Sequence, residues 1–328
     1  MFEHEEVLDI LQDFKRMRPK KRRKVIKALF FDDDFIKWLF QPEKVANLNT
    51  IVTDMYAEFT KPIVMEAMVG AVREEGPYEF TRSHATFMFS VANIAIQGSN
   101  EMVEEISKKK KAGTLSSREI RERLDRVDQT NDVVSDLLKA SRKIIKRDAS
   151  KLSRETRLPK YVCITALHSV PEPIYVDRFK IGFYLNNLLN SIYSDVEANG
   201  DFENHVRWRQ FFKNVFGEDN VVEAATFILL EGVHRVERYQ NSDDVRTCWD
   251  SLTSFALREL NDAPKQLRQQ MIELYIKRID KMFANRSFDL RVNLLDLSKR
   301  LFPELADTVD KYAEKIEQII NRGTETVK

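Results

Sequence analysis

Glycine and proline, the two residues that most often end helices, are scarce in this sequence. The chain of 328 residues contains nine of each, against average shares of roughly 7% and 5% in proteins. At the same time, 43% of the residues are hydrophobic, which supplies enough apolar surface for buried cores. A chain with few sharp turns and ample apolar side chains is expected to be globular and mostly helical.

Apolar residues recur at helical spacing along most of the chain. Near the start, Val7, Ile10, Leu11 and Phe14 fall on one face of a predicted helix. Pro19 stands where a first-turn proline would begin the next helix. No alternating apolar and polar segment is long enough to predict a strand. We therefore predict an all-α fold, a multi-helix bundle.

The organisation predicted along the chain has three parts. Residues 1–106 are expected to form an N-terminal helical domain, residues 107–170 a long basic helix with a second motif at its end, and residues 171–328 stacked helical hairpins. The polar segment 107–117 is the expected linker, and Ser117 at its end is the expected N-cap of the long helix.

The long central helix carries the 4,3 spacing of a coiled-coil seam, with three polar interruptions. Such a seam either pairs with a second chain or folds onto its own chain, and the spacing allows both. The seam consists of Ile120, Leu124, Val127, Asn131, Val134, Leu138, Ser141, Ile145, Asp148 and Leu152.

Charge is segregated along the chain, although the formal net charge is only +1. Residues 15–27 hold nine Lys or Arg and no acid, and residues 107–160 hold seventeen basic against eight acidic residues. The remainder is acidic, so the distribution of charge says more about partners than its total. The basic segments are candidates for phosphate contact; the alternative is that they are only solvated helix faces.

The run MRPKKRRKV, residues 17–25, holds the densest positive charge. Its PKKRRKV core resembles a monopartite nuclear localisation signal, which is read in a flexible, exposed form. The apolar Val25, Ile26 and Leu29 predict a folded helix instead. We interpret the run as a phosphate-binding face, with a solvated face as the alternative. The residues assigned to nucleic acid here are Lys20, Lys21, Arg22, Arg23 and Lys24.

The segment DASKLSRETRLPKYVCITAL, residues 148–167, resembles the helix-turn-helix of transcriptional regulators over about twenty residues. The resemblance implies that the second helix enters the major groove. Arg157 stands where the turn usually has glycine, and Cys163 occupies a buried aliphatic position. The alternative is a helix end, a proline break and a buried helix in an ordinary bundle. The apolar positions of the motif are Leu152, Leu158, Val162, Ala166 and Leu167.

Basic residues surround this motif, since residues 139–160 hold nine basic residues against two acids. That excess is the charge expected where phosphates bind. The resemblance implies that the exposed side of the second helix contacts base edges and phosphates. The nucleic-acid-binding candidates in this region are Lys143, Lys146, Arg147, Arg154, Arg157, Lys160, Tyr161 and Thr165.

Catalytic and metal motifs have little support in this sequence. It has no HExxH pair, no glycine-rich phosphate loop and no GxSxG elbow. Glu231 and His234 form one Glu-x-x-His, but di-iron bundles need a second such pair. The acid triplet at 32–34 is interpreted as a loop and helix N-cap. We expect no enzymatic activity, no bound metal and no cofactor.

The cysteines and the apolar stretches indicate in which cellular compartment the protein is expected. Cys163 and Cys248 lie far apart, which argues against a disulfide framework and a thiolate metal site. The N-terminus begins with acids where a signal peptide needs basic residues. The longest apolar stretch, 85–96, is too short to span a bilayer. We expect a soluble cytoplasmic protein without a membrane partner; nuclear is the alternative if residues 19–25 act as an import signal.

Together these features lead to two functional hypotheses, with a helical enzyme as a third alternative. The first is a non-enzymatic DNA-binding protein, regulatory or architectural, which binds DNA rather than RNA and contacts itself or another protein through helical surfaces. The second is an α-helical scaffold or adaptor that mediates protein–protein assembly, in which the basic segments are only solvated faces.

Overall fold

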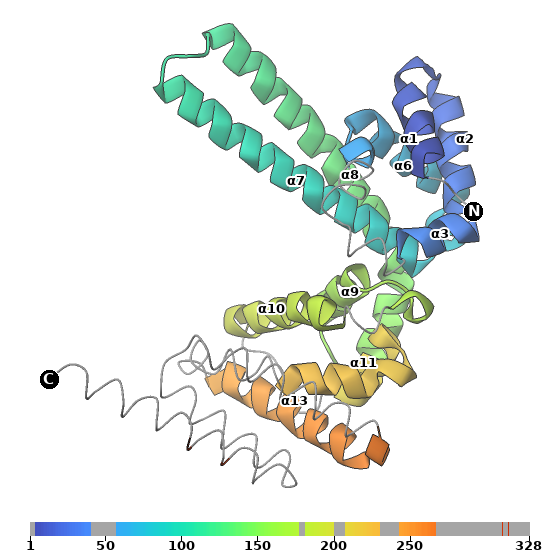
Figure 1. Ribbon diagram of the computed structural model, residues 1–328, viewed down its shortest axis with the longest axis vertical. Coiled ribbons are helices and arrows are strands. Elements are labelled where there is room, and N and C mark those ends of the chain that lie inside the picture. Colours follow the sequence, from blue (N-terminus) through green and yellow to red (C-terminus); the bar gives the residue numbers. More distant parts are fainter. Residues whose placement is uncertain are drawn as a thin grey trace, which may run out of the picture. The chain divides into compact units, whose positions relative to one another are not determined.

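A computed structural model describes five ranges of the chain and two single residues beyond them. The described residues are 4–40, 57–176, 181–199, 207–229, 243–266, 310 and 314. All the regular structure in them is helical (Figure 1), which confirms the predicted all-α fold.

The chain divides into two compact units. Unit 1 contains Met1–Lys180 and Lys213–Gly217, and unit 2 contains Ile181–Phe212 and Glu218–Lys328. The predicted segments 1–106 and 107–170 therefore lie together in unit 1.

The first part of unit 1 consists of short helices around an aromatic core. Pro19 occupies the first turn of its helix, as predicted, where the missing N–H would have had no helical acceptor. The Asp32 carboxylate accepts a 2.9 Å hydrogen bond from the Phe35 N–H, which confirms the N-cap predicted in the acid triplet. In the core, the Phe59 and Phe87 rings meet edge to face with centroids 4.9 Å apart. The elements are α1 (His4–Gln12), η1 (Asp13–Arg16), α2 (Pro19–Phe30), α3 (Asp33–Leu39), α6 (Pro62–Glu75) and η2 (Pro77–Glu79).

Two long helices, α7 (Arg82–Lys111) and α8 (Ser117–Thr156), form an antiparallel hairpin in unit 1 (Figure 1). Residues 107–111 continue α7, so the segment expected to be a linker is the end of a helix followed by a tight turn. In that turn Gly113 has a φ of 68°, which glycine adopts without steric cost.

The N-cap of α8 lies one residue before the predicted one. The Ser116 hydroxyl accepts from the Glu119 N–H at 3.2 Å, and the Glu119 carboxylate accepts from the Ser116 N–H at 2.8 Å. This reciprocal capping box satisfies two N–H groups that the helix itself leaves unpaired. The expected cap, Ser117, is the first residue of the helix instead.

The coiled-coil seam of α8 packs within its own chain over most of its length, because α8 contacts α6, α7 and α9. Nearer the hairpin turn the seam is open, since Leu124 is 39% exposed and Asn131 is also exposed. The buried seam residues are Val127, Val134, Ser141, Ile145 and Leu152.

A buried arginine at the start of α7 anchors two other segments of unit 1. Arg82 is 9% exposed, and its guanidinium donates to four backbone carbonyls. Nε lies 2.8 Å from the Val170 oxygen, Nη1 lies 2.9 Å from the Asn214 oxygen, and Nη2 contacts the oxygens of Pro171 and Val215. Two of these residues follow helix α9 (Lys160–Ser169) and two lie in the last turn of α11 (Trp208–Phe216). A cation is favourable at both places because helix C-termini carry partial negative charge.

The same turn of α7 adds hydrogen bonds around this arginine. The Ser83 hydroxyl donates to the Glu172 carboxylate at 3.0 Å and accepts from the Glu172 N–H at 3.1 Å. The Thr86 hydroxyl lies 3.2 Å from the Val170 oxygen. Burial lowers the pKa of Arg82 to about 10, and the nearby carboxylate of Glu172 opposes that shift. Arg82 is still protonated at neutral pH.

A buried histidine joins α7, α8 and α9. His168 Nε2 lies 2.6 Å from the Ser141 hydroxyl oxygen, and that hydroxyl lies 3.3 Å from the Ala85 carbonyl oxygen. The imidazole stacks on Phe89 with ring centroids 4.7 Å apart and planes 6° apart. Burial lowers the pKa of His168 to about 4, and the nearby charge of Arg142 lowers it further. The imidazole is therefore neutral at physiological pH.

Both cysteines are free and buried. Burial raises the pKa of Cys163 and that of Cys248 to about 12, so neither thiol forms a reactive thiolate at neutral pH. Among the residues that the structure describes, no helix is both long and apolar enough to cross a membrane.

Unit 2 is described over four helical segments and one short 3-10 turn. Helices α10 and α13 pack against each other, and the Phe212 and Phe255 rings stack with centroids 5.2 Å apart. The helices expected in residues 171–328 are present at 181–199, 208–216, 221–229 and 243–262. Beyond residue 266 only Asp310 and Glu314 are described, both of them helical, and the Glu231 and His234 pair lies outside the described residues. The elements are α10 (Ile181–Asn199), the start of α11, η5 (Glu218–Asn220), the helical residues 221–229 and α13 (Asp243–Asp262).

We predict that Arg82→Met lowers the free energy of unfolding by roughly 3 to 5 kcal/mol, because buried carbonyl oxygens lose their donors. Arg82→Lys should lower the free energy of unfolding by less, because lysine keeps the positive charge. It still should be less stable than the unmodified protein, since an ammonium group cannot reach four oxygens at once. Urea unfolding of the full chain measures both. An Arg82→Met protein as stable as the unmodified one would contradict this role.

We also predict a loss of stability on mild acidification. Because the pKa of His168 is about 4 when folded and about 6.5 when unfolded, its contribution is full above pH 6.5 and falls as the pH drops toward 4. Between pH 7.5 and pH 5, protonation of this one group should lower the free energy of unfolding by about 2 kcal/mol. Urea unfolding at the two pH values measures it. His168→Gln should flatten this dependence, and an unchanged pH profile in that variant would contradict the prediction.

Candidate nucleic-acid interface

The C-terminal half of α8 carries a row of exposed basic residues. Lys139, Lys143, Lys146, Ser150 and Arg154 succeed one another at spacings of three or four residues, which places them on one helix face. The four basic residues are exposed. Over fifteen residues the row extends about 22 Å, at 1.5 Å per residue. Arg142, also exposed, flanks the row and widens it. We call Lys139, Arg142, Lys143, Lys146 and Arg154 the α8 basic row.

The acids of this part of α8 do not interrupt the row. Asp148 lies 3.3 Å from the predicted site residue Arg147, and Glu155 lies 3.9 Å from Lys151. Within the described residues, four members of the α8 basic row have no ion-pair partner. These four are Arg142, Lys143, Lys146 and Arg154. Their charges are therefore available to an external anion.

The turn predicted after α8 is present. Arg157 has a φ of 63°, in the left-handed region, so this arginine adopts the conformation for which the motif usually uses glycine. Its N–H donates to the Ser153 carbonyl at 2.9 Å, and the Ser153 hydroxyl donates to the Leu158 carbonyl at 2.7 Å. Leu158 is buried, as the motif requires, and α9 begins at Lys160.

Helix α9 buries most of its surface and leaves a narrow exposed side. The predicted buried positions Val162, Cys163, Ala166 and Leu167 are all buried. On the other side Lys160 is exposed and Tyr161 is 47% exposed.

Thr165, the second residue assigned to base edges, is only half-buried. Its hydroxyl donates to the Tyr161 carbonyl at 3.1 Å. This bond uses the donor of Thr165, so the hydroxyl can only accept from a base. The exposed side of α9 therefore has a cation that can bind phosphate, but few hydrogen-bond donors for base edges.

The basic run of α2 is divided between structural and exposed side chains. Arg22 donates to the Phe14 carbonyl at 2.7 Å, and Arg23 forms an ion pair with Glu74. The remaining three members of the run, Lys20, Lys21 and Lys24, are exposed. Two of the five predicted residues thus hold α2 in place.

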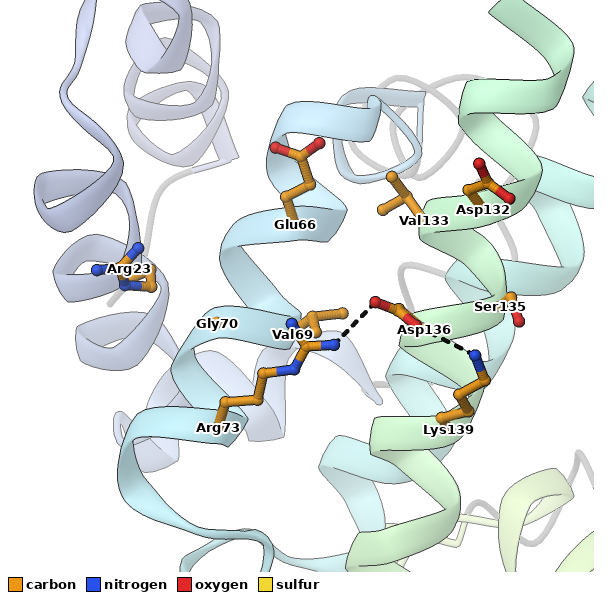
Figure 2. Close-up of a pocket in the computed structure, with 10 residues that line it drawn as sticks. All are labelled: Arg23, Glu66, Val69, Gly70, Arg73, Asp132, Val133, Ser135, Asp136 and Lys139. Atoms are coloured by element: carbon orange, nitrogen blue, oxygen red, sulfur yellow. Dashed lines mark hydrogen bonds and ion pairs between the residues drawn. The ribbon is translucent and has the colours of Figure 1, made fainter.

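A groove of about 500 Å³ lies between α2, α6 and α8 (Figure 2). In it Asp136 bridges Arg73 at 2.8 Å and Lys139 at 3.3 Å, and these contacts lower the pKa of Asp136. Glu66 and Asp132 also line it. An entering phosphate would meet these carboxylates, so this groove is not a phosphate site. Lys139 and Arg23 both line the groove, but the carboxylates separate the α2 run from the α8 basic row.

Of the predicted residues of α8, the structure places Lys143, Lys146 and Arg154 on one face, whereas Arg147 pairs with Asp148. The α2 run lies on another helix, from which only Arg23 reaches the groove shared with Lys139. Sequence reasoning missed Arg142 and Lys139, although both fit the spacing of three or four residues that links Lys143 to Lys146. That spacing was the signal that could have found them.

The fold and this surface define an all-helical protein with a long helical hairpin and an exposed basic helix face. Comparison with protein-family models, with curated protein sequences and with solved structures found no match for this chain.

We predict that Arg157→Gly keeps the fold and raises the free energy of unfolding by up to about 1 kcal/mol, because glycine adopts a positive φ without strain. Arg157→Val should lower it by about 1 kcal/mol or more, since a β-branched residue fits that conformation poorly. Urea unfolding compares the two. A glycine variant less stable than the valine variant would contradict the strain assigned to the positive φ at this position.

Proposed function

We propose that this protein is a non-enzymatic nucleic-acid-binding protein that holds duplex DNA by its phosphate backbone. The single observation that carries the proposal is the α8 basic row, with four exposed cations that no carboxylate of the described residues neutralises. Arg157 and Lys160 continue the positive charge beyond the end of the helix.

The length and rigidity of this surface suit a duplex. A straight row of about 22 Å matches the rise of about six base pairs at 3.4 Å each. Lys and Arg that neutralise phosphates release condensed counterions, and this release is the main source of sequence-independent affinity. Helix α9 has few exposed hydrogen-bond donors, and base selection needs side chains that reach base edges. This favours sequence-independent binding to the phosphate backbone over recognition of a base sequence.

Duplex DNA is favoured over RNA by the element that follows the row. A helix after a tight turn can enter the wide major groove of B-DNA, whereas the major groove of A-form RNA is too deep and narrow for side chains to read. Tyr161 and Lys160 are the α9 residues closest to that role, and Thr165 can accept a hydrogen bond beside them.

We predict that changing Lys143, Lys146 and Arg154 together to glutamine weakens binding to random-sequence duplex DNA on the order of a hundredfold at physiological salt. The slope of log affinity against log salt should fall in magnitude by about 2.7, since each lost phosphate contact removes about 0.9. Titrations between about 50 mM and about 200 mM salt measure both quantities.

The matched control changes three exposed lysines at the end of α7, Lys108, Lys110 and Lys111, to glutamine. This control also removes three positive charges, but none of them belongs to the α8 basic row. The affinity for duplex DNA should therefore be mostly retained. A wild-type protein that binds no DNA at low salt, or equal losses in the two variants, would refute the proposal. Tyr161→Ala and Thr165→Ala test base reading separately, because they should alter preference between sequences and not the salt slope.

A helical scaffold is the second candidate, and one observation favours it. The α7–α8 hairpin exposes Ile94, Met102, Val103 and Leu124, each between 38% and 42%. Scattered apolar side chains are common on protein surfaces, so this observation is weaker than the uncompensated charge of α8. Failure to bind DNA together with self-association in light scattering would favour the scaffold.

A further inference from the structure

Unit 2 has a positively charged groove of its own. A groove of about 430 Å³ runs between the start of α11 and α13. Grooves of this size accommodate small molecules. Three arginines and one acid line it, together with serine hydroxyls and two aromatic rings. The lining residues are Arg207, Trp208, Arg209, Gln210, Ser251, Ser254, Phe255, Arg258 and Glu259.

The one acid that lines the groove is ion-paired. Arg209 Nε lies 3.0 Å from a carboxylate oxygen of Glu259, and the Arg209 guanidinium also pairs with Glu218. These contacts raise the pKa of Arg209, the hydrogen bond to Glu218 most of all. By contrast, Arg207 and Arg258 have no ion-pair partner in the part of the chain that the structure describes. The groove therefore has two guanidinium groups available to an anion.

Hydroxyl donors are oriented in the same groove. The Trp208 indole N–H donates to the Ser251 hydroxyl oxygen at 3.0 Å. Ser251 is thus an acceptor toward Trp208, and its own hydroxyl proton is free to turn toward a ligand. Ser254 lies one residue before Phe255 and is exposed to the groove.

The backbone and the aromatic rings complete the arrangement. The first N–H groups of α11, those of Trp208 and Arg209, have no acceptor within the helix, and a helix N-terminus carries partial positive charge. Trp208 and Phe255 are buried to 3% and 9% exposure and provide an apolar wall. One guanidinium group can donate two parallel N–H hydrogen bonds to phosphate oxygens. Hydroxyl and backbone N–H groups can donate to the oxygen lone pairs that remain.

We infer that this groove of unit 2 binds the phosphate group of a small molecule, with Arg207 and Arg258 as the charged ligands and Ser251 and Ser254 as hydroxyl donors. The shared chemistry is a phosphate dianion. It can be inorganic phosphate or the phosphate of a nucleoside monophosphate, whose base would lie against the apolar wall. The inference does not depend on the α8 basic row.

The test is calorimetric titration of the full chain with inorganic phosphate, with adenosine monophosphate and with adenosine. Lys139, Arg142, Lys143, Lys146 and Arg154 are changed to glutamine in every protein tested, so that the α8 basic row gives no background. Arg207→Gln and Arg258→Gln should each weaken phosphate binding tenfold or more. Lys265→Gln removes one exposed charge from the same unit and should change it less than twofold. Circular dichroism confirms that the variants are folded.

The three ligands distinguish the sources of the phosphate. Equal affinity for phosphate and adenosine monophosphate, lost in both arginine variants, supports a site for phosphate alone. Tighter binding of the nucleotide, with the same loss, supports a phosphorylated ligand with a ring. No binding of either anion up to about 10 mM, binding of adenosine as tight as its monophosphate, or affinity unchanged in both arginine variants would overturn the inference.

Discussion

The organisation of unit 1 depends on one buried guanidinium. Arg82 lies in the first turn of α7 and donates to the carbonyls at the end of α9 and in the last turn of α11, segments 88 to 133 residues further along the chain. Few other side chains could do this, because only arginine offers five N–H donors in a planar fork. The desolvation of that charge is offset by four carbonyl oxygens that would otherwise be buried without donors. The α7–α8 hairpin, α9 and the segment after it are positioned together by this contact.

The sequence predicted the local features of the fold and missed the distant ones. The proline at the start of α2 and the N-cap at Asp32 follow from residues within one helical turn, and both are confirmed. The N-cap of α8 was predicted one residue late because Ser116 and Ser117 are chemically equal, and only the reach of Glu119 selects between them. The lysines at 108–111 suggested a linker, yet lysine is a good helix former and cations are favourable at a helix C-terminus. No pattern in the sequence pairs Arg82 with residues more than eighty positions away.

In the candidate site, too, the sequence predicted local features but not the long-range contacts. The charge of residues 139–160 was visible in the sequence, and α8 places part of it, Lys139, Lys143, Lys146 and Arg154, on one face. Whether a basic residue faces solvent or a carboxylate is decided by tertiary contacts: Arg23 pairs with Glu74, 51 residues away, while Lys24 beside it is exposed. Arg157 is a different case, because an arginine with positive φ goes against its steric preference. The turn forms there because Ser153 binds both of its ends and Leu158 is buried beyond it.

The continuity of α8 has a mechanical consequence. Forty residues without a break form a stiff rod of about 60 Å, with the hairpin tip at one end and the Arg157 turn at the other. A tilt of about 10° about the turn would displace the tip by roughly 10 Å. Because α7 packs along α8, any such tilt must displace the whole α7–α8 hairpin, and the lysines at 108–111 move furthest because they lie at its tip.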